Sequence, residues 1–447
     1  MRQARSRVRG FTLVELMVSL VAGLIVTIAV VGLARAATTT FFEAARISTV
    51  ESTVRTAAER LRQDLARSAY MSTGNIKLAR DGALPPASVP MAHKIAVVNP
   101  SVIGGPGGSR YAALNDLQGV QIIRGGSGNA PIPNAGTAGP NTLSANNGLN
   151  PDALILGGNY TTDDSYQGTF FNTPGSCGVQ NVALTRVADA AVHRLIRSTP
   201  VPLTSVQAAF TPVPGRPFSA RVVDARGCQH YVVVCGVTAN DDGAQISFSP
   251  DDGGGPAVLQ GGGTNCGAKD SEPVTISPVQ RVRWYIGPNV DPALDPAAGV
   301  EVAGNKFNLY REFLDAANPP VPIVAMRQIV AEYAVDLKLG LSVVNALGGV
   351  EVFDMDDTGT AIGLYGQAAS ATLPNAEGPQ RIRSVRFRLV TRTAVPDRNQ
   401  NLVVLPGAPY ITRYCVTNAP AATCKSFTRV RTIISEVALT NQLGMTY

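Results

Sequence analysis

The longest uninterrupted run of apolar residues lies near the N-terminus of the chain. From Phe11 to Leu33 the only formally charged residue is Glu15. A helix over this segment is about 35 Å long at about 1.5 Å per residue, which is enough to cross the hydrocarbon core of a membrane. We therefore predict a membrane-spanning helix over residues 11–33. The carboxylate near its start is costly in lipid unless a partner neutralises it.

Beyond Leu33 the pattern changes, but no proline interrupts a continued helix. Apolar residues recur at intervals of three or four, which is typical of one buried helix face. They are Val50, Val54, Ala57, Leu61, Leu65 and Ala69. Charged residues occupy the other faces. We predict an amphipathic continuation over residues 34–72, with the helix itself ending near Tyr70 and a stop signal at residues 72–75, packed on a globular head.

From about Gly74 onward, apolar and polar residues alternate in short segments, which is typical of strands half-buried in an antiparallel sheet. The clearest segments are residues 282–286, 333–339 and 385–389. Further candidates are residues 119–124, 153–156, 231–237, 306–311, 350–353 and 427–439. Residues 125–151 and 240–267 are rich in small and turn-forming residues and are interpreted as long loop insertions. The predicted head, residues 73–447, has a possible division into two lobes near residues 270–280.

The segment before the apolar run is basic. Arg2, Arg5, Arg7 and Arg9 precede Gly10, and no acidic residue does. Basic residues mark the cytoplasmic side of a membrane helix, so the N-terminus is expected in the cytoplasm and the head outside it. The sequence GFTLVE at residues 10–15, between this leader and the apolar run, resembles the class III signal of type IV pilins and type II secretion pseudopilins.

The resemblance implies three properties of the N-terminus. A prepilin peptidase would remove residues 1–10 by cutting between Gly10 and Phe11, and would N-methylate Phe11. Glu15 would lie one helical turn from that amine. In a filament, its carboxylate would meet the positive N-terminus of the neighbouring subunit.

Two other interpretations of the N-terminus are an uncleaved signal anchor and a cleaved secretory signal. The sequence Ala34-Arg35-Ala36 imitates the cleavage site of a secretory signal. The apolar run is longer than the usual ~7–15 residues of such a signal, and an internal charge would be unusual there. The prepilin interpretation is therefore preferred.

The C-terminal third adds to the resemblance. Residues 381–392, 427–431 and 436–441 look like the end of PilW-type minor pilins, and the related J-type pseudopilins share this layout. Their endings tend to carry an arginine before the last asparagine, where this chain has Thr440. The length of 447 residues fits a large minor pilin rather than a major pilin. The resemblance implies an α+β, type IV pilin-like fold: a long N-terminal helix packed on a large antiparallel β-sheet head.

Six cysteines all follow the predicted membrane segment: Cys177, Cys228, Cys235, Cys266, Cys415 and Cys424. An even number in an oxidising compartment favours disulfides, and six cysteines allow fifteen pairings that the sequence does not decide. Cys415 and Cys424 could close a short loop, which resembles the disulfide-bounded loops near pilin C-termini. A zinc site at Cys228, His230 and Cys235 is disfavoured, because no C-x-x-C is present.

Composition indicates an ordered, loop-rich body, with 45% hydrophobic and 16% charged residues, 44 glycines and 31 prolines. The formal charge of +6 includes the four leader arginines, so a chain starting at Phe11 would carry +2. This small net charge gives no support for binding a polyanion.

Catalytic chemistry is not apparent in the sequence. The histidines His93, His193 and His230 are scattered, and no catalytic motif is visible. We therefore expect no enzyme activity and no cofactor. Asp354, Asp356 and Asp357 begin like a calcium loop, but Tyr365 stands where a bidentate glutamate is expected. They remain weak calcium candidates, with a solvated turn preferred.

Arginines lie close together on two predicted strands. They are Arg281 and Arg283, directly before Trp284, and Arg381, Arg383, Arg386, Arg388 and Arg392. Such stripes can bind DNA in competence pilins, but an exposed strand face is also charged to discourage edge pairing. The second interpretation is preferred, so nucleic acid is not expected as a partner.

These patterns lead to a structural minor pilin of the PilW type as the expected function. It would be anchored in the inner membrane, with a periplasmic head, and would then join a type IV pilus at the cell surface, near the tip and below another subunit. Expected partners are the prepilin peptidase, other minor pilins, the major pilin and the inner-membrane assembly platform, with a tip adhesin as a further candidate. The alternatives are a J-type pseudopilin of type II secretion and a DNA-binding competence pilin.

Overall fold

The computed structural model describes residues 11–76, 114, 117–124, 147, 149–162, 165–173, 180–184, 203–216, 218–225, 227, 229–240, 243–248, 268–289, 306–316, 322–345, 347–355, 365, 378–396, 413–416, 424 and 426–443. The chain divides into two compact units, Met1–Ser52 and Thr53–Tyr447. The second unit is called the head below. The predicted α+β class, with a long N-terminal helix and a head rich in antiparallel strands, is confirmed.

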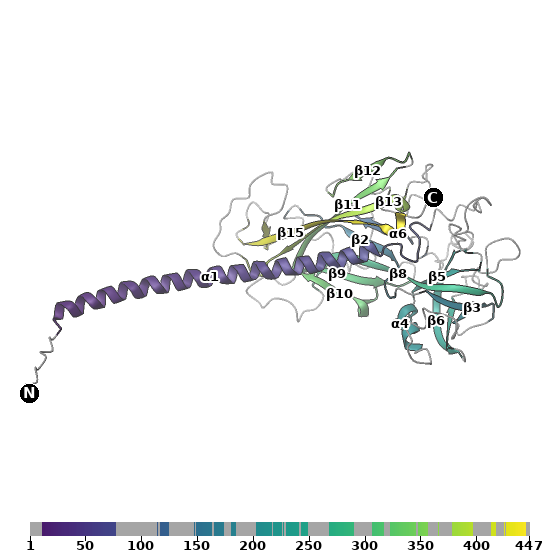
Figure 1. Cartoon of the computed structure of the whole chain (residues 1–447), viewed down its shortest axis with the longest axis horizontal. Coiled ribbons are helices and arrows are strands. Elements are labelled where there is room, and N and C mark those ends of the chain that lie inside the picture. Colours follow the sequence, from purple (N-terminus) through teal and green to yellow (C-terminus); the bar gives the residue numbers. More distant parts are fainter. Residues whose placement is uncertain are drawn as a thin grey trace, which may run out of the picture. The chain divides into compact units, whose positions relative to one another are not determined.

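A single helix, α1 (Leu13–Ala66), runs through the boundary between the two units (Figure 1). It ends a few residues before the predicted end near residue 70. Ala69 adopts a left-handed φ of 58° and donates its N–H to the carbonyl of Gly157 at 2.8 Å. The carbonyl of Tyr70 accepts the N–H of Asn159 at 2.9 Å. Hydrogen bonds to the end of a strand therefore replace helical ones, and this sets where α1 stops.

The described strands of the head form two antiparallel sheets. The larger one has ten strands: β1 (Val120–Ile123), β2 (Ala153–Gly158), β3 (Tyr166–Phe171), β4 (Gln180–Leu184), β5 (Ser219–Val223), β6 (Gln229–Asn240), β7 (Gly243–Phe248), β8 (Pro273–Pro288), β9 (Phe307–Leu314) and β10 (Gln328–Glu332). The smaller one has the strand order β12-β11-β13-β15-β14 and contains β11 (Ala334–Val344), β12 (Val350–Phe353), β13 (Ile382–Arg392), β14 (Arg413–Cys415) and β15 (Phe427–Ala438).

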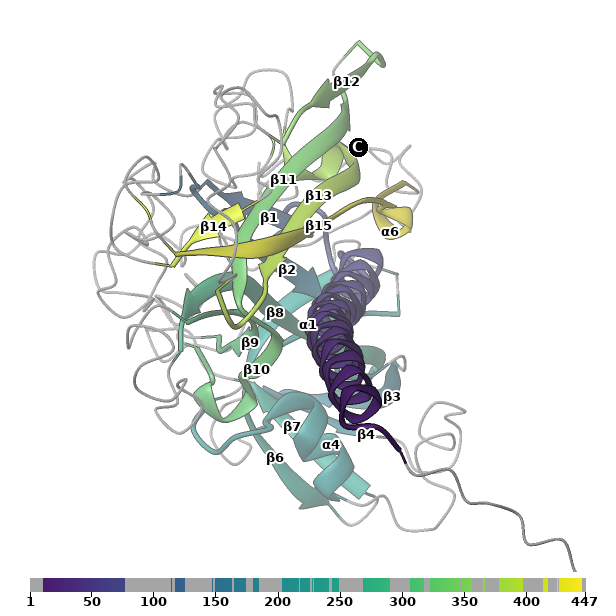
Figure 2. The ribbon, with the colours of Figure 1, turned by 90° about the vertical axis from the view of Figure 1, so that its left-hand side faces the viewer.

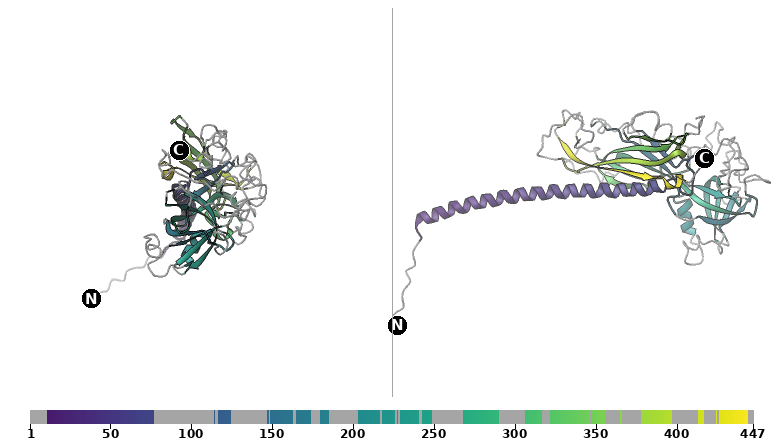
Figure 3. Two further views of the ribbon diagram at one scale, coloured as in Figure 1. Left: turned by 90° about the vertical axis from the view of Figure 1, so that its right-hand side faces the viewer. Right: turned by 45° about the horizontal axis from the view of Figure 1, so that its top comes forward.

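Part of the larger sheet closes on itself as a barrel. The strands β3, β4, β7, β6 and β5 pair in that order, and both β3 and β5 pair with the first half of β8. Ile276 of β8 thus lies opposite both Tyr166 and Val222. Closure removes the exposed edges of these strands. Figure 3 shows the barrel as a group of teal strands, apart from the green and yellow strands of the smaller sheet.

Side chains fill the barrel rather than leaving a wide lumen. The short helix α4 (Leu203–Phe210) contributes to this core, and the rings of Tyr166 and Phe210 are 5.7 Å apart. Phe170 and Phe248 are fully buried in the same core. The barrel is thus a packed unit in the part of the chain that the structure describes.

The second half of β8 belongs to a different layer. It pairs with β2 on one side and β9 on the other. This part of the larger sheet, the smaller sheet and the last turns of α1 share one hydrophobic core, to which Leu61, Trp284 and Phe387 each contribute from a different layer. The amphipathic stripe of α1 is therefore buried from Val54 to Leu65, as its spacing predicts.

Several predicted strands coincide with observed ones. The three clearest segments lie in β8, β11 and β13, apart from Tyr333, which has a φ of 55° and lies between β10 and β11. The six further candidates overlap β1, β2, β6, β9, β12 and β15.

The interpretation of residues 240–267 as one loop is wrong in part, because β7 lies inside this range and pairs with both β4 and β6. Most of residues 125–151 and the rest of residues 240–267 lie outside the described residues. The division into two lobes near residues 270–280 stays a prediction.

Candidate functional site

The start of α1 carries a reciprocal hydrogen-bonded cap. The Glu15 carboxylate accepts the backbone N–H of Thr12 at 3.1 Å and its hydroxyl at 3.0 Å, while the Glu15 N–H donates to the Thr12 hydroxyl oxygen at 3.2 Å. This is a capping box, which satisfies backbone donors that a helix start otherwise leaves free. Phe11 lies just before the helix, and Gly10 lies outside the described residues. In the single chain, the Glu15 carboxylate thus accepts hydrogen bonds from the first turn of its own helix.

The apolar part of α1 is exposed among the residues that the structure describes. Its most apolar window has a mean hydropathy of 2.7 and is 0% buried, so α1 is long and apolar enough to cross a membrane by length and composition. The exposed large side chains run from Phe11 to Phe42. A continuous apolar surface of this size marks contact with lipid or with other chains.

The opposite end of α1 is fixed to the head by Asp64. The Arg311 guanidinium donates through Nε to Oδ2 of Asp64 at 2.6 Å, and Nε1 of Trp284 donates to the same oxygen at 3.0 Å. Both charged side chains are almost fully buried, at 3% and 6% exposure. The Tyr160 hydroxyl donates to the backbone carbonyl of Asp64 at 3.3 Å, and burial, together with the Asp64 charge, raises the pKa of Tyr160 well above its ordinary value. We call Asp64, Trp284 and Arg311 the helix anchor.

The last described turn of the chain also reaches α1. The side-chain amide of Asn441, in the short helix α6 (Thr440–Leu443), donates to the carbonyl of Ala66 at 2.8 Å and to that of Ser68 at 3.2 Å. Carbonyls at a helix C-terminus have no intrahelical partner, so this side chain caps α1. Asn441, which belongs to the C-terminal segment that resembles minor pilins, thus has a structural role that the sequence alone did not indicate.

Replacing Asn441 with alanine should lower the free energy of unfolding of the head by about 1 kcal/mol, because two carbonyls lose a donor and must turn to water. Thermal unfolding followed by circular dichroism measures the effect. Thr440 is exposed, so Thr440→Ala is the matched control and should change stability by less than about 0.5 kcal/mol. Equal effects of the two substitutions would contradict the capping role.

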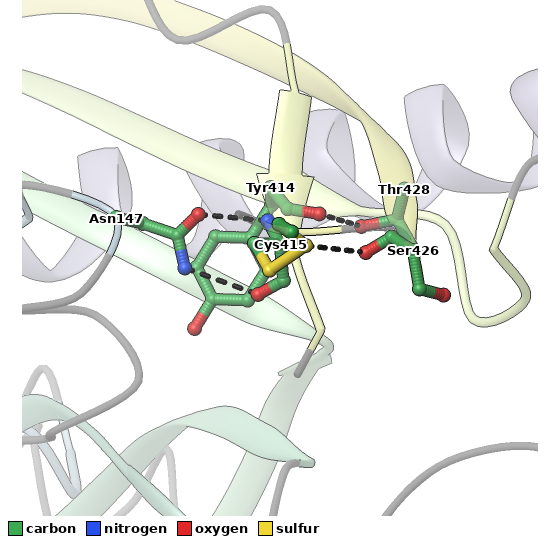
Figure 4. The surroundings of a disulfide bond; sticks show 6 residues. Asn147, Tyr414, Cys415, Ser426 and Thr428 are labelled. Atoms are coloured by element: carbon green, nitrogen blue, oxygen red, sulfur yellow. Dashed lines mark hydrogen bonds between the residues drawn. A yellow bond between two sulfur atoms is a disulfide. The ribbon is translucent and has the colours of Figure 1, made fainter. Parts of the chain in front are cut away.

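Cys415 and Cys424 form a disulfide, with their Cα atoms 6.0 Å apart. Figure 4 shows how Asn147 lies against this bridge. Its side chain accepts the Cys415 N–H at 2.7 Å and donates to the Cys415 carbonyl at 3.0 Å. Cys235 is also disulfide-bonded, to a cysteine outside the described residues. The other three, Cys177, Cys228 and Cys266, lie outside the described residues.

Replacing both Cys415 and Cys424 with serine should destabilise the head by about 2–3 kcal/mol, since a bridge that closes a loop of about ten residues restricts the unfolded chain by that amount. Chemical denaturation measures the loss. Reduction is a poorer test because it also attacks the Cys235 bridge. A double variant as stable as the wild type would show that the bridge is dispensable.

The calcium candidates are only partly described. Asp354 is exposed and accepts the N–H of Met355 at 2.7 Å, which is the geometry of a local turn. Asp356 and Asp357 lie outside the described residues. Among the residues that the structure describes, no group of three His, Cys, Asp or Glu side chains could hold a metal ion.

The two arginine stripes are less exposed than the sequence suggested. Arg283 is fully buried and donates through Nε to Glu312 at 2.7 Å, and Arg392 is 1% exposed with its guanidinium over the rings of Tyr333 and Tyr414. Arg388 pairs with Asp336 at 3.2 Å. The expectation of an exposed basic face is therefore wrong for Arg283 and Arg392, because buried acids and aromatic rings on neighbouring strands surround them.

The processing residues and the helix anchor are far apart along the chain, and only the former belong to a pattern that is visible in the sequence. Asp64 was treated as part of the polar face of the helix, and Arg311 as an ordinary strand residue. One signal for the anchor was present: Asp64 follows the apolar-stripe residue Leu61 by three positions, which places it on the same face of the helix.

Comparison with known proteins finds one similarity. Residues 5–31 match the family model described as the prokaryotic N-terminal methylation motif. No curated protein and no solved structure matches the chain. With the apolar N-terminal helix, this motif supports a type IV pilin-like protein that is processed by a prepilin peptidase, anchored in the inner membrane and assembled with other pilins.

Proposed function

We propose that this chain is a minor pilin of the PilW type, a structural subunit that helps to initiate a type IV pilus. Cleavage between Gly10 and Phe11 would free the amine of Phe11, which is then methylated. The observation that carries the proposal is the prepilin motif at the start of a helix whose apolar half is wholly unburied. Such a half-helix has to be covered by lipid before assembly and by other pilin helices afterwards.

Glu15 supports a place below another subunit. Its carboxylate has only Thr12 as a partner among the described residues of the isolated chain. Transfer of an acidic side chain to the centre of a bilayer costs about 2.5–3.5 kcal/mol on insertion scales, so the charge gains most from a cation held in the same plane. The free amine of an adjoining subunit supplies that cation. The size of the head, predicted at residues 73–447, favours a position near the tip, because a head this large would crowd its neighbours in every turn of a thin filament.

Processing is tested by mass spectrometry of the native protein. The expected N-terminal peptide begins at a monomethylated Phe11. A peptide that begins at Met1 or at Ala37 would overturn the proposal, since the first means an unprocessed anchor and the second a secreted protein without its helix.

The role in a pilus is tested by deletion of the gene. Fewer pili in the sheared surface fraction, with normal protein secretion, is the result expected for a minor pilin. Normal piliation with a loss of secreted proteins would instead assign the chain to type II secretion as a J-type pseudopilin. In either case the subunit is structural, and catalysis is not part of the proposal.

A further inference from the structure

The hairpin formed by β11 and β12 presents an unusual apolar edge. β12 is the terminal strand of the smaller sheet, and among the described residues no strand pairs with its outer side (Figure 2). Val350 and Val352 of this strand are 70% and 57% exposed, and Leu347 at the hairpin tip is 96% exposed. Exposed sheet edges usually carry lysine, proline or a bulge that prevents pairing with another chain. None of these three is present in β12, whose protection is limited to its length of four residues and to the charge of Glu351.

The exposed tip is nevertheless constrained by hydrogen bonds to Asn345. The side-chain oxygen of Asn345 accepts the N–H groups of Leu347 at 3.0 Å and Gly349 at 2.8 Å, and its amide donates to Glu351 at 2.7 Å. The Arg381 guanidinium donates to the carbonyl of Asn345 at 2.8 Å. The apolar side chains are therefore presented by an ordered hairpin, so little conformational entropy is lost when they are covered.

The segment between Lys338 of β11 and Arg381 is one-sided in charge. From Leu339 to Gln380 the sequence contains five acidic residues and no lysine or arginine. Of these acidic residues, Glu351 and Asp354 are exposed on or directly after β12. An acidic, apolar edge is complementary to a strand that carries valine-like side chains and basic ones, and it disfavours acidic partners.

We propose that β12 is a docking edge for an extended basic segment of another protein, which adds to the smaller sheet as a further antiparallel or parallel strand. Backbone hydrogen bonds to the free edge would supply the affinity, and contacts with Val350 and Val352 together with Glu351 and Asp354 would supply the specificity. The proposal concerns this edge alone and does not depend on whether the chain joins a filament.

The test uses the full chain in detergent micelles and two fluorescent peptides of about ten residues, one alternating valine with lysine and one alternating valine with glutamate. Fluorescence anisotropy measures binding, and hydrogen exchange locates it. The valine–lysine peptide should bind and slow amide exchange in β12. The double variant Val350→Ser with Val352→Ser should weaken binding about tenfold or more. Val324→Ser is the matched control, because Val324 is 64% exposed but lies outside the hairpin, and it should leave binding unchanged.

A second double variant, Glu351→Gln with Asp354→Asn, should weaken binding of the valine–lysine peptide several-fold and reduce the salt dependence of that binding. The substituted valines are exposed, so the variants should fold and melt like the wild type. Equal binding of the acidic peptide, or equal weakening by Val324→Ser, would overturn the proposal. Concentration-dependent dimers of the free chain that the valine double variant abolishes would also overturn it, because the occupant would then be a second copy.

Discussion

Replacing Glu15 with leucine should leave the protein in the membrane and cut at Gly10, but reduce its recovery in sheared filaments about tenfold or more. The substitution removes the only acid of the apolar segment. The helix is then more stable in lipid, by less than the about 2.5–3.5 kcal/mol that applies at the bilayer centre, and it has no charge to pair with an adjoining amine. Immunoblots of the sheared and membrane fractions measure the partition. Glu15→Asp, which keeps the charge, should assemble better than the leucine variant.

The capping box offers an internal control for this experiment. Thr12→Val removes the hydroxyl that bonds Glu15 but keeps the carboxylate. If intersubunit charge is what matters, the valine variant should still assemble. Wild-type recovery of Glu15→Leu, or a loss in Thr12→Val as large as in Glu15→Leu, would mean that the carboxylate acts only on its own helix.

Replacing Asp64 with alanine should lower the free energy of unfolding of the head by about 3–5 kcal/mol. The substitution leaves the Arg311 guanidinium buried without its carboxylate and removes the acceptor of Trp284, and a broken buried pair is far costlier than a broken surface pair. Urea denaturation of the full chain in detergent, followed by the fluorescence of Trp284, measures the effect. Trp284 is the single tryptophan of the chain and reports on the helix anchor directly.

Two further variants serve as controls for the prediction about Asp64→Ala. Glu59 lies on the same helix with a 63% exposed side chain, and its contact with Arg62 is 3.8 Å long, so Glu59→Ala should cost less than about 1 kcal/mol. Asp64→Ala combined with Arg311→Met should recover much of the loss, because no charge is then left buried. If the double variant is no more stable than Asp64→Ala, the cost arises from packing rather than from the ion pair.

Helices and strands with a regular spacing of apolar residues were predictable from the sequence. A helix without proline and with an apolar stripe was predictable, and so were strands such as β13, where the apolar side chains alternate. The Asp64 environment was not, because the pairing of a helix carboxylate with an arginine 247 residues away depends on the tertiary fold. Arg283 was misjudged for the same reason, since alternation assigns a charged residue to solvent unless its buried partner is known.

The barrel shows the limit of local patterns more clearly. Strands β3 and β5 are only six and five residues long, and closure requires each of them to pair with β8 at a distance along the chain. Nothing in the sequence of residues 166–171 or 219–223 specifies which strand each of them pairs with. The functional residues show the same limit. The N-terminal motif is contiguous in the sequence and was predicted. The capping of α1 by Asn441 was not predicted, because the helix ends 375 residues before Asn441.

Strand β8 connects the barrel to the contact between α1 and the larger sheet. Its first half is one strand of the barrel, and its second half carries Trp284, which donates a hydrogen bond to Asp64 of α1. Unfolding of the barrel would therefore displace Trp284 from Asp64. Because β8 takes part in both, heating should disrupt the barrel and the contact between Trp284 and Asp64 in the same transition.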